Sequence, residues 1–489
     1  MSKERWLHIE KIDNINARVT TNHPSIFGEL YNHLSYFVEN YRFMPKYKMG
    51  MWDGKIYFMQ KNGIFPIGLL KYVYKFVKQN GIKITIDKSL TEKKVITDFA
   101  DITETWLGEN ENGDPWVPYN HQISGALNAL KYNRCILEHA TSAGKSLTMA
   151  LIIMYKLLKR QNKKILVLVP STGLVKQLTS DFIEYGISPE WIGNFYGGQK
   201  DTEEQIIIST WQSMCRQKEL VKTFDMLICD EVHNLRGNVV RSVADNAINA
   251  NTRIGCTGTL PDPKVDKMRI EGSLGPVVHK VTARDLIDDG HASDVLIKLA
   301  YIFHKKDIKK KIKGLPYDDE RKFLEEYEPR NKVIRHIVKT HHKADHNCLV
   351  LVDHIEHVER LEELLKTLGE DRHIFVVTGK TKPDEREKIR KFVNKNKKCL
   401  IIATYGVFST GISIKRLHAV IFGSAGKSKI KTLQSIGRGL RLHKEKSKLM
   451  LYDIGDDLYY SNRHLQKRLE IYEKSKFDII VDEINLEKY

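Results

Sequence analysis

A short loop between an apolar run and a helical pattern carries the residues best suited to chemistry in this sequence. The apolar run covers 135–137, Thr141-Ser142-Ala143-Gly144-Lys145-Ser146 follows, and apolar residues at helical spacing continue over 147–158. Small residues at a helix start let backbone N–H groups close around phosphate oxygens. In such a loop Lys145 would reach the β- and γ-phosphates of a nucleotide and Ser146 would hold Mg²⁺. Gly-Lys-Ser also occurs at ordinary helix starts, so these residues alone leave both interpretations open.

An acidic pair supplies the next requirement of phosphate chemistry, a carboxylate that orients or deprotonates water. Asp230 and Glu231 directly follow the apolar run at 227–229, 85 residues beyond Lys145 (230 minus 145). In this position Asp230 can be aimed at Mg²⁺ and Glu231 at the attacking water. Acidic pairs after strands are more often solvated turns. This pair gains weight because it falls in the same predicted sheet as the loop.

Two arginines near the C-terminus can supply the cation that balances charge in the transition state. Arg438 and Arg441 lie three residues apart in the stretch 434–441, so on a helix they share nearly one face and can point at one anionic site. They fall in a second predicted domain. They could therefore reach the phosphates only across an interdomain cleft that closes on nucleotide and opens after hydrolysis.

The elements that must position these residues form two predicted α/β domains, at 119–296 and 297–457. Short, nearly continuous apolar runs alternate with helical patterns, as is typical of strands buried on both faces of a parallel sheet. In such doubly wound sheets the ligand lies at the carboxyl ends of the strands, where the polar residues named above fall. The predicted strands are 166–169, 205–209, 226–229 and 253–256 in the first domain, and 348–352, 374–377, 400–403, 419–422 and 448–452 in the second.

Residues 1–90 predict a small α+β domain, with helical patterns at 26–40 and 69–79 and strand patterns at 56–59 and 82–86. Aromatic and cationic residues alternate over 42–55 and include Lys46, Lys48 and Trp52. Such a mixture can hold phosphates and stack bases. Aromatic residues closing a small core beneath solvated lysines explain the pattern equally well.

Three further segments are assigned by composition. Residues 91–118 lose periodicity and carry turn residues, which predicts a linker between domains. The basic run at 305–311 is read as a solvated face, with a phosphate contact as the alternative. Residues 458–489 predict a charged helical tail to which we assign no function.

The composition indicates which kind of partner the protein binds and where in the cell it is found. Lys and Arg number 79 against 61 Asp and Glu, and the net charge of +18 favours a polyanionic partner, nucleic acid before membrane, although a generally basic surface is the alternative. The six cysteines show no CxxC pair, which argues against a zinc site or a disulfide framework. No apolar signal core or membrane-length run is present. We expect a cytoplasmic protein without a membrane partner.

Taken together, the motifs resemble, in order and spacing, those of superfamily 2 helicases of the DExH type. The series spans 119–455. It consists of 141–146, Asp230-Glu231-Val232-His233, Thr257-Gly258-Thr259, Ser409-Thr410-Gly411-Ile412-Ser413 and 434–441. The sequence is most similar to the phage-encoded recombination helicases of this superfamily, through 139–146, 403–413, Asn40-Tyr41-Arg42-Phe43 and Trp52-Asp53-Gly54.

The resemblance implies two tandem RecA-like domains behind the small α+β domain, with ATP and Mg²⁺ as cofactors. Gln122 would read adenine, although His121 replaces the more usual aromatic residue. His139 and Ser142 also depart from the small residues or glycine of many relatives. Besides Lys145, Asp230 and Glu231, the resemblance implies that Gln434, Arg438 and Arg441 complete the catalytic site, with Arg441 as the arginine finger. It implies that His233, Thr257, Thr259, Thr410 and Gly411 couple this site to nucleic acid.

The resemblance also implies a groove that contacts the sugar-phosphate backbone of one strand, which makes binding independent of sequence and sensitive to salt. A role as a strand-end cap is the alternative for each residue. The predicted groove residues are Pro170, Ser171, Thr172, Gly197, Gly198, Thr210, Gln212, His354, Thr378, Gly379 and Thr404.

The function implied by the resemblance is ATP-dependent 3′ to 5′ helicase action. Its substrates would be single-stranded, forked or branched DNA and RNA–DNA hybrids, in phage replication, recombination and repair, with the protein acting as a monomer, in the host cytoplasm if it is phage-encoded. One alternative is a translocase on double-stranded DNA that does not separate the strands. Another is a non-catalytic nucleic-acid-binding protein with an inactive motor fold. The expected mark of that alternative is the loss of Lys145, Glu231 or Arg441, and all three are present.

Overall fold

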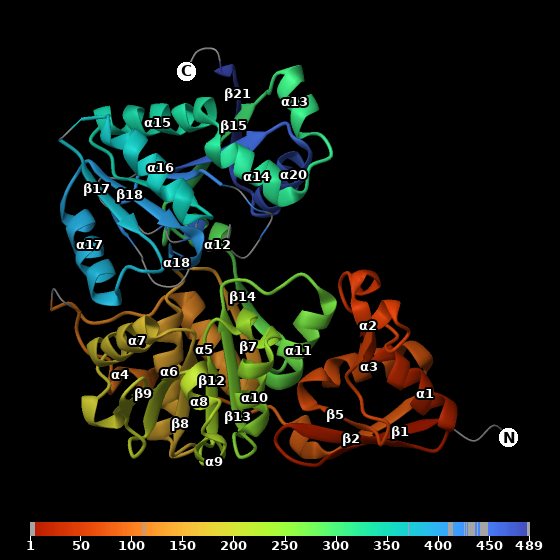
Figure 1. Cartoon of the computed structure of the whole chain (residues 1–489). Coiled ribbons are helices and arrows are strands. Elements are labelled where there is room, and N and C mark those ends of the chain that lie inside the picture. The colour runs from red at the N-terminus through yellow and green to blue at the C-terminus, as the bar shows by residue number, and fades with distance from the viewer. Residues whose placement is uncertain are drawn as a thin grey trace. The chain divides into compact units, whose positions relative to one another are not determined.

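The computed structural model describes residues 5–486, except 111–112, 370, 409–413, 425, 427, 429–435, 438 and 441–447. The chain forms two compact units (Figure 1). The first contains residues 1–139 and 144–280, and the second contains residues 140–143 and 281–489. None of the helices in the described part of the chain has the length and apolar character needed to span a bilayer.

The N-terminal α+β domain is built on a four-stranded sheet with the order β5-β2-β1-β6. Strand β1 pairs antiparallel with β2 and parallel with β6, and β3 and β4 form a separate hairpin. The elements are β1 (Trp6–Lys11), β2 (Asn16–Thr21), α1 (Pro24–His33), β3 (Ser35–Phe37), η1 (Tyr41–Phe43), α2 (Pro45–Lys48), β4 (Lys55–Tyr57), β5 (Ile64–Pro66), η2 (Ile67–Leu69), α3 (Leu70–Asn80), β6 (Lys83–Ile86) and η3 (Lys88–Leu90).

The helix predicted over 26–40 is wrong in its second half. Helix α1 ends at His33, and the next residues form β3, which pairs with β4 about 20 residues further on. The hydrogen bonds of that hairpin override the local helical pattern. Strands β1 and β2 were not predicted, although buried and exposed side chains alternate along both, as in a sheet with one covered face.

The first α/β domain contains an eight-stranded sheet with the order β10-β9-β11-β8-β12-β13-β7-β14. Its elements are α5 (Asn120–Tyr132), β7 (Arg134–His139), α6 (Lys145–Leu158), β8 (Ile165–Val169), α7 (Thr172–Glu184), η4 (Pro189–Trp191), β9 (Ile192–Tyr196), β10 (Gln199–Lys200), β11 (Ile206–Thr210), α8 (Trp211–Met214), α9 (Lys218–Lys222), β12 (Met226–Cys229), η5 (Val232–Arg236), α10 (Asn238–Asn246), β13 (Thr252–Thr257), α11 (Lys264–Leu274) and β14 (Val277–Val281).

Two apolar cores cover the two faces of this sheet. Alternate residues of β8 belong to different cores: Ile165 and Val167 pack with α5, α6 and α7, while Leu166 and Leu168 pack with α8 and α10. Because both faces are covered, every residue of β8 is apolar and buried. This explains why the continuous apolar runs correctly predicted the inner strands β8, β11, β12 and β13.

The segment predicted as a linker, 91–118, contains helix α4 (Phe99–Glu104). Phe99 is buried in the core formed with α5 and α6, and Trp106 and Trp116 pack against the same core. The segment therefore has linker composition and also covers one side of the first α/β domain. Its boundaries as a linker stay a prediction.

The second unit contains a seven-stranded sheet with the order β17-β18-β16-β19-β20-β15-β21, whose strand pairs are all parallel. Its elements are α12 (Ala283–Asp288), β15 (Asp294–Ile302), α13 (Lys306–Ile312), α14 (Tyr317–Glu326), α15 (Glu328–Lys343), β16 (Cys348–Val352), α16 (Ile355–Lys366), β17 (His373–Val377), α17 (Pro383–Lys395), β18 (Cys399–Thr404), α18 (Tyr405–Phe408), β19 (Ala419–Phe422), β20 (Lys448–Asp456), α20 (Tyr459–Lys474) and β21 (Asp478–Ile484).

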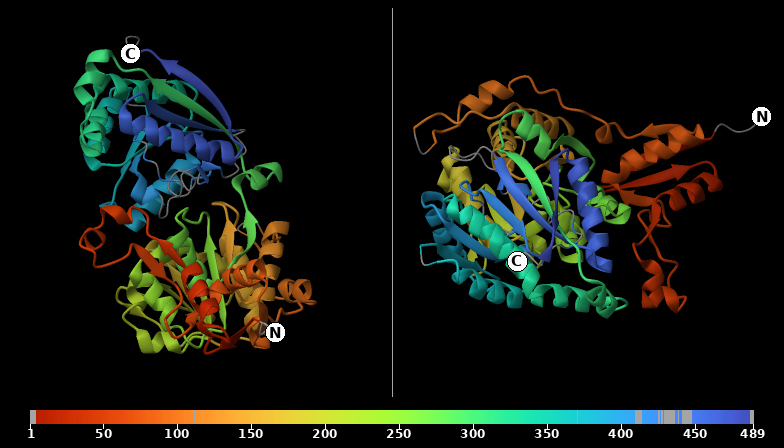
Figure 2. Two further views of the ribbon diagram at one scale, coloured as in Figure 1. Left: turned by 90° about the vertical axis from the view of Figure 1, so that its right-hand side faces the viewer. Right: turned by 90° about the horizontal axis from the view of Figure 1, so that it is seen from above.

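All five strands predicted for the second domain are confirmed as β16 to β20 (Figure 2). The predicted helical tail is only half correct, because α20 is followed by β21, which pairs with β15 as an edge strand. The lysine-rich run at 305–311 lies mostly on the exposed helix α13. Five of the six cysteines are buried, and none forms a disulfide, as expected for core thiols.

Candidate ATP site and nucleic-acid groove

The predicted phosphate loop joins β7 to α6 at the carboxyl edge of the first sheet. Gly144 is the N-cap of α6 and adopts a left-handed conformation with φ 72°. The left-handed conformation favours glycine here, and a Cβ would also displace the end of the Gln122 side chain, because it would lie 2.1 Å from Nε2. Ser142 also has a positive φ, of 75°. The loop thus adopts its sharp turn with a serine where many relatives have glycine.

His139 does not prevent loop formation because its side chain points away from the loop. The imidazole is completely buried, and its Nε2 lies 2.9 Å from Nδ1 of His279. Burial lowers the pKa of His139 to about 3, so the ring is neutral. The backbone carbonyl of His139 accepts a hydrogen bond from Nζ of Lys145 at 3.3 Å. Lys145 is therefore folded onto its own loop, and a bound phosphate could replace the carbonyl as its partner.

Gln122, the predicted adenine reader, belongs to a capping box at the start of α5. Its Oε1 accepts from the backbone N–H of Tyr119 at 2.8 Å, and its Nε2 donates to the carbonyl of Gly144 at 3.4 Å. Gln122 thus ties the start of α5 to the phosphate loop. Adenine recognition by this side chain stays a prediction.

The acidic pair lies at the carboxyl end of β12, next to β8 and β13. Asp230 is partly buried, and desolvation, reinforced by the negative charge of Glu231, raises its pKa to about 7, while Lys145 opposes this shift. Oδ1 of Asp230 is buried without a hydrogen-bond partner among the described residues. Buried carboxylate oxygens are rarely left unpaired, and a hard oxygen donor suits Mg²⁺. Asp230 and Ser146 are therefore a fitting donor pair for that ion.

A chain of polar contacts leads from the carboxylate to the end of the neighbouring strand. Nδ1 of His233 lies 3.3 Å from Oε2 of Glu231 and 3.2 Å from Oγ1 of Thr257. Thr257 Oγ1 donates its one proton to the carbonyl of Thr259 at 3.1 Å, so it must accept from His233. The structure brings these four predicted residues together, and we call them the Glu231–Thr259 relay.

The groove residues predicted in the first domain share the carboxyl edge of β9, β11 and β8, which are neighbours in the sheet. Ser171 Oγ accepts from the backbone N–H of Leu174 as the N-cap of α7, and Thr210 Oγ1 accepts from Ser213 as the N-cap of α8. Of the remaining positions of the set, Pro170 is partly buried, and four are exposed at the same edge: Thr172, Gln212, Gly197 and Gly198. Capping is thus confirmed for two residues, and contact with nucleic acid stays a prediction.

The groove residues of the second unit follow the neighbouring strands β17, β18 and β16. Nδ1 of His354 lies 2.9 Å from both carboxylate oxygens of Glu325, which belongs to α14. Thr378 and Thr404 are buried at the ends of β17 and β18, and Gly379 is exposed. Five predicted residues lie outside the described part of the chain: Gln434, Arg438, Arg441, Thr410 and Gly411.

Three family models match successive parts of the chain. Residues 8–87 match the N-terminal domain of the DNA helicase UvsW, residues 115–262 match the Res subunit of type III restriction enzymes, and residues 329–443 match the conserved C-terminal domain of helicases. The ATP-dependent DNA helicase UvsW of Enterobacteria phage T4 is 31% identical over 490 residues, which cover 94% of this chain and 96% of the relative. The chain belongs to the UvsW family of superfamily 2 helicases.

Other similarities agree with this assignment. A crystal structure of T4 UvsW is 29% identical, matches 98% of this chain and 100% of its own, and superimposes with a TM-score of 0.52. The DNA 3′-5′ translocase XPB2 of Sulfurisphaera tokodaii is 25% identical over 68% of this chain and 80% of its own length. This member of the UvsW family is therefore an ATP-dependent helicase, and its two parallel-sheet domains are RecA-like.

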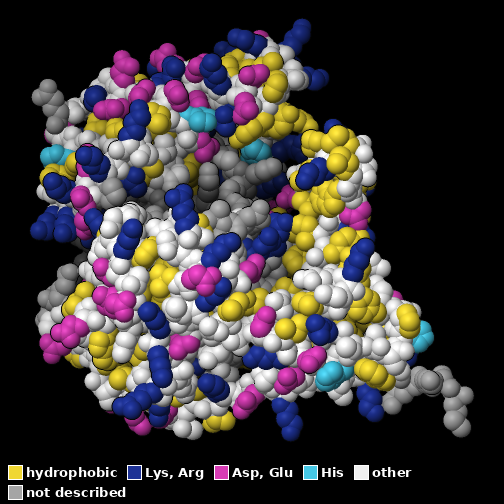
Figure 3. Space-filling model, turned by 60° about the horizontal axis from the view of Figure 1, so that its bottom comes forward, with side chains coloured by type: hydrophobic (Ala, Val, Ile, Leu, Met, Phe, Trp, Pro, Cys, Tyr) yellow, Lys and Arg dark blue, Asp and Glu magenta, His cyan; other side chains and the backbone are white. Residues whose placement is uncertain are grey.

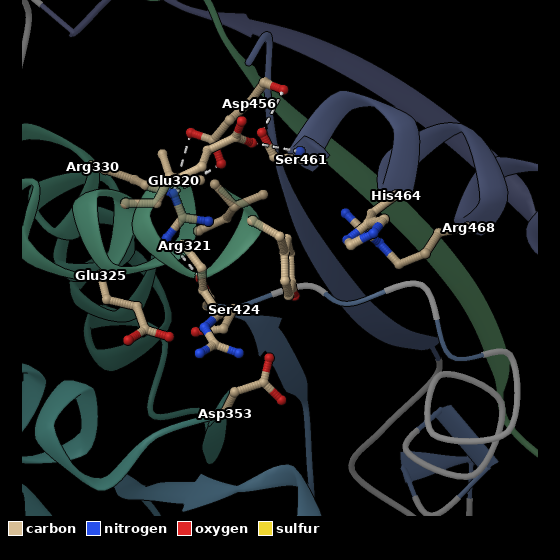
Figure 4. A pocket seen from close by; sticks show the side chains of 14 residues that line it. Glu320, Arg321, Glu325, Arg330, Asp353, Ser424, Asp456, Ser461, His464 and Arg468 are labelled. Carbon is tan, nitrogen blue, oxygen red and sulfur yellow. Dashed lines mark hydrogen bonds and ion pairs between the residues drawn. The ribbon is translucent and has the colours of Figure 1, made fainter. Parts of the chain in front are cut away.

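A small polar cavity of about 40 Å³ lies at the carboxyl ends of β16, β19 and β20 (Figure 4). Several of its charged groups already have partners: Arg330 Nε donates to Asp456, and Glu320 accepts from backbone N–H groups at the start of α20. The volume suits one or two water molecules. We therefore assign the cavity a structural role, in holding α14 and α20 against the sheet of this UvsW-family domain.

Some site residues could not be found from sequence. Tyr185, near the end of α7, places its hydroxyl 2.8 Å from Oγ of Ser146, and no local pattern connects these two positions. The capping box of Tyr119 and Gln122 did have a signal, because cap partners are spaced three residues apart.

Of the three N-terminal predictions, Lys46 and Lys48 are exposed on α2, and Trp52 Nε1 donates to the carbonyl of Lys55 at 2.7 Å.

Proposed function

We propose that this helicase moves 3′ to 5′ along one DNA strand and remodels forks, branched recombination intermediates and RNA–DNA hybrids. The main structural support for the motor mechanism is the Glu231–Thr259 relay. It links the proposed catalytic carboxylate to the end of the neighbouring β-strand, β13, through defined contacts. The similarity to T4 UvsW, a DNA helicase, and to XPB2, a 3′-5′ translocase, supports the substrate and the direction.

In the proposed reaction, Lys145 exchanges its contact with the His139 carbonyl for the β- and γ-phosphates of ATP. Bound Mg²⁺ would neutralise phosphate charge, with Ser146 and Asp230 as its protein ligands. Glu231 orients the attacking water. The contacts of His233 and Thr257 change with the charge on Glu231. Thr259 transmits that change to the end of β13. Arg438 and Arg441 are proposed to stabilise the transition state from the second RecA-like domain.

Lys145→Ala and Glu231→Gln should each lower DNA-stimulated ATP hydrolysis roughly 100-fold or more, because each removes charge stabilisation or water activation from the transition state. Steady-state phosphate release measures the effect, and circular dichroism checks the fold. Lys163→Ala and Glu219→Gln, at exposed positions, are matched controls that should keep full turnover. Full activity of either site variant would refute this assignment of residues.

The second candidate is a translocase that tracks along a duplex without separating it, favoured by the match of residues 115–262 to a restriction-enzyme motor subunit. ATPase stimulation should be compared across single strands, duplexes, hybrids, forks and four-way junctions, with strand displacement and triplex displacement measured in parallel. Branch remodelling predicts greatest stimulation by forks and junctions. Equal stimulation by plain single strands refutes it, and triplex displacement without strand displacement supports the duplex translocase.

A further inference from the structure

The segment from η1 to Trp52 projects from the N-terminal domain and exposes an unusual set of apolar side chains. Figures 1 and 2 show α2 standing away from the sheet of its domain. The exposed fraction is 75% for Phe43, 63% for Met49 and 73% for Met51. Contiguous exposed apolar groups usually mark an interaction site. We call these three residues the apolar tip.

The tip rests on a closely packed aromatic base. The ring of Tyr41 stacks on Phe37 with centroids 4.5 Å apart and meets Tyr47 edge-on at 4.8 Å. A Cβ on Gly54, which has φ +83°, would lie 2.3 Å from the Tyr41 ring, so the turn at Gly54 lets the backbone approach this ring. The tip is therefore presented by a built support, and its exposure does not come from an unstructured loop.

Three cationic residues belong to the same segment as the apolar tip. Lys46 and Lys48 are exposed on α2, and Arg42 lies over the face of Tyr41 at 5.7 Å. The nearby carboxylate of Asp53 is engaged by the Tyr57 hydroxyl at 2.6 Å. A surface with an apolar centre and a cationic rim is complementary to DNA, whose bases are apolar on their faces and whose phosphates are anionic.

The N-terminal domain is fixed to α11, the helix that follows the relay residues Thr257 and Thr259. The completely buried carboxylate of Glu271 on α11 accepts from Lys71 Nζ at 2.7 Å and from the Tyr72 hydroxyl at 2.6 Å. A Cβ on Gly68 would lie 1.9 Å from the carbonyl oxygen of Glu271. The domain therefore follows the first RecA-like domain as it moves.

We propose that Phe43, Met49 and Met51 form the wedge that separates base pairs at a DNA branch point, with Lys46 and Lys48 holding the flanking phosphates. The inference rests on the proposed function and names its strand-separating element. Apolar side chains inserted between base steps offset the cost of unstacking. A wedge carried by the first RecA-like domain would be driven into the duplex with each step of the motor.

The test replaces the tip by serine at all three positions in the full-length protein. A control replaces three comparably exposed apolar residues elsewhere, Val95, Tyr459 and Val481, by serine. A third variant carries leucine at the three tip positions. We expect fork base pairs separated per ATP hydrolysed to fall at least tenfold in the serine tip variant only. The leucine variant should retain most of the unwinding, because the wedge needs apolar bulk and no specific group.

A second measurement tests the wedge without ATP turnover. Wild-type protein bound to a fork with 2-aminopurine at the branch point should raise its fluorescence through unstacking, and the serine tip variant should not. Equal unwinding and equal fluorescence in both proteins would overturn the wedge and leave the patch as a surface for a protein partner. If wild-type protein unstacks the branch but never displaces a strand, the wedge is supported and the proposed function fails.

Discussion

At the scale of single residues, the phosphate loop shows how two unusual side chains can be accommodated. His139 is turned into the space beside α5, where a Cβ on Gly125 would lie 2.6 Å from its ring. Only its backbone carbonyl faces Lys145. Ser142 takes the positive φ that many relatives assign to glycine, at a cost of order 1 kcal/mol. In the proposed function the loop acts through backbone N–H groups and Lys145, and neither His139 nor Ser142 removes one of these groups.

The relay predicts a specific defect for Thr257→Val, a change that keeps the shape of the side chain and removes its hydroxyl. The hydroxyl accepts from His233 and donates to Thr259, and both groups would lose a buried partner. The loss should cost about 1–3 kcal/mol of folding free energy. We further expect the ratio of DNA-stimulated to DNA-free ATP hydrolysis to fall about tenfold, because His233 then no longer contacts the strand end.

The control variant Thr103→Val separates the loss of folding stability from the change in the ratio of hydrolysis rates. Thr103 is buried on α4, where its hydroxyl donates to the carbonyl of Phe99 at 2.7 Å, far along the chain from the relay. It should lose similar stability in urea denaturation and keep the wild-type ratio of hydrolysis rates. A Thr257→Val protein with an unchanged ratio would show that the relay is structural only.

At the scale of elements, the sequence predicted strands that are apolar along their whole length and missed strands in which polar residues alternate with apolar ones. The inner strands β8, β12 and β16 are apolar throughout, and such runs stand out locally. Strands β1, β2 and β15 carry charged or polar residues between buried ones, and β21 has no buried residue, so the existence of all four depends on partners elsewhere in the chain. The hairpin of β3 and β4 ended a predicted helix for the same reason.

The candidate site divides in a similar way. Lys145, Asp230 and Thr257 could be found because they follow apolar runs, and parallel strands bring their carboxyl ends to one edge. Tyr185 and Glu271 could not be found. Their contacts, with Ser146 and with Lys71 and Tyr72, join residues 39 to 200 positions apart and arise only from tertiary packing.

The junction between η2 and α11 predicts a large effect for Gly68→Ala. The added methyl group would overlap the carbonyl of Glu271, and both backbones must shift to admit it. We expect the packing of the N-terminal domain against α11 to lose about 3 kcal/mol of free energy. Limited proteolysis, analysed by mass spectrometry for cuts between residues 80 and 100, measures release of the domain.

Gly28→Ala is the matched control for this junction. Gly28 lies on the exposed face of α1, and a Cβ there meets nothing within 4 Å. Alanine in a helix interior should stabilise the domain by about 0.5–1 kcal/mol. If Gly68→Ala resists proteolysis as well as Gly28→Ala does, the N-terminal domain is not rigidly fixed to α11, and the wedge loses its mechanical support.

At the scale of the whole molecule, the face drawn in Figure 3 carries its positive charge in many places and not in one stripe. Figure 3 shows Lys and Arg side chains spread over the visible face, interspersed with acidic ones. The excess of 79 basic over 61 acidic residues acts as a general attraction for a polyanion. In the proposed function, position on the DNA comes from the groove residues at the ends of the β-strands, whose backbone N–H groups and hydroxyls do not depend on base sequence.

Binding through general positive charge and backbone contacts predicts that the affinity for DNA falls steeply with salt and does not depend on base sequence. With about six phosphate contacts, the logarithm of the affinity for single-stranded DNA should fall with a slope near −4 against the logarithm of salt concentration. Affinity should therefore drop roughly 250-fold between 50 and 200 mM NaCl, equally for mixed-sequence and homopolymeric strands. Fluorescence anisotropy of labelled oligonucleotides measures this. Because the tip would add apolar contacts and Lys46 and Lys48 would add phosphate contacts, a fork should show a higher affinity and a steeper slope than a single strand. A flat slope would mean that base contacts dominate and that the backbone groove is wrongly assigned.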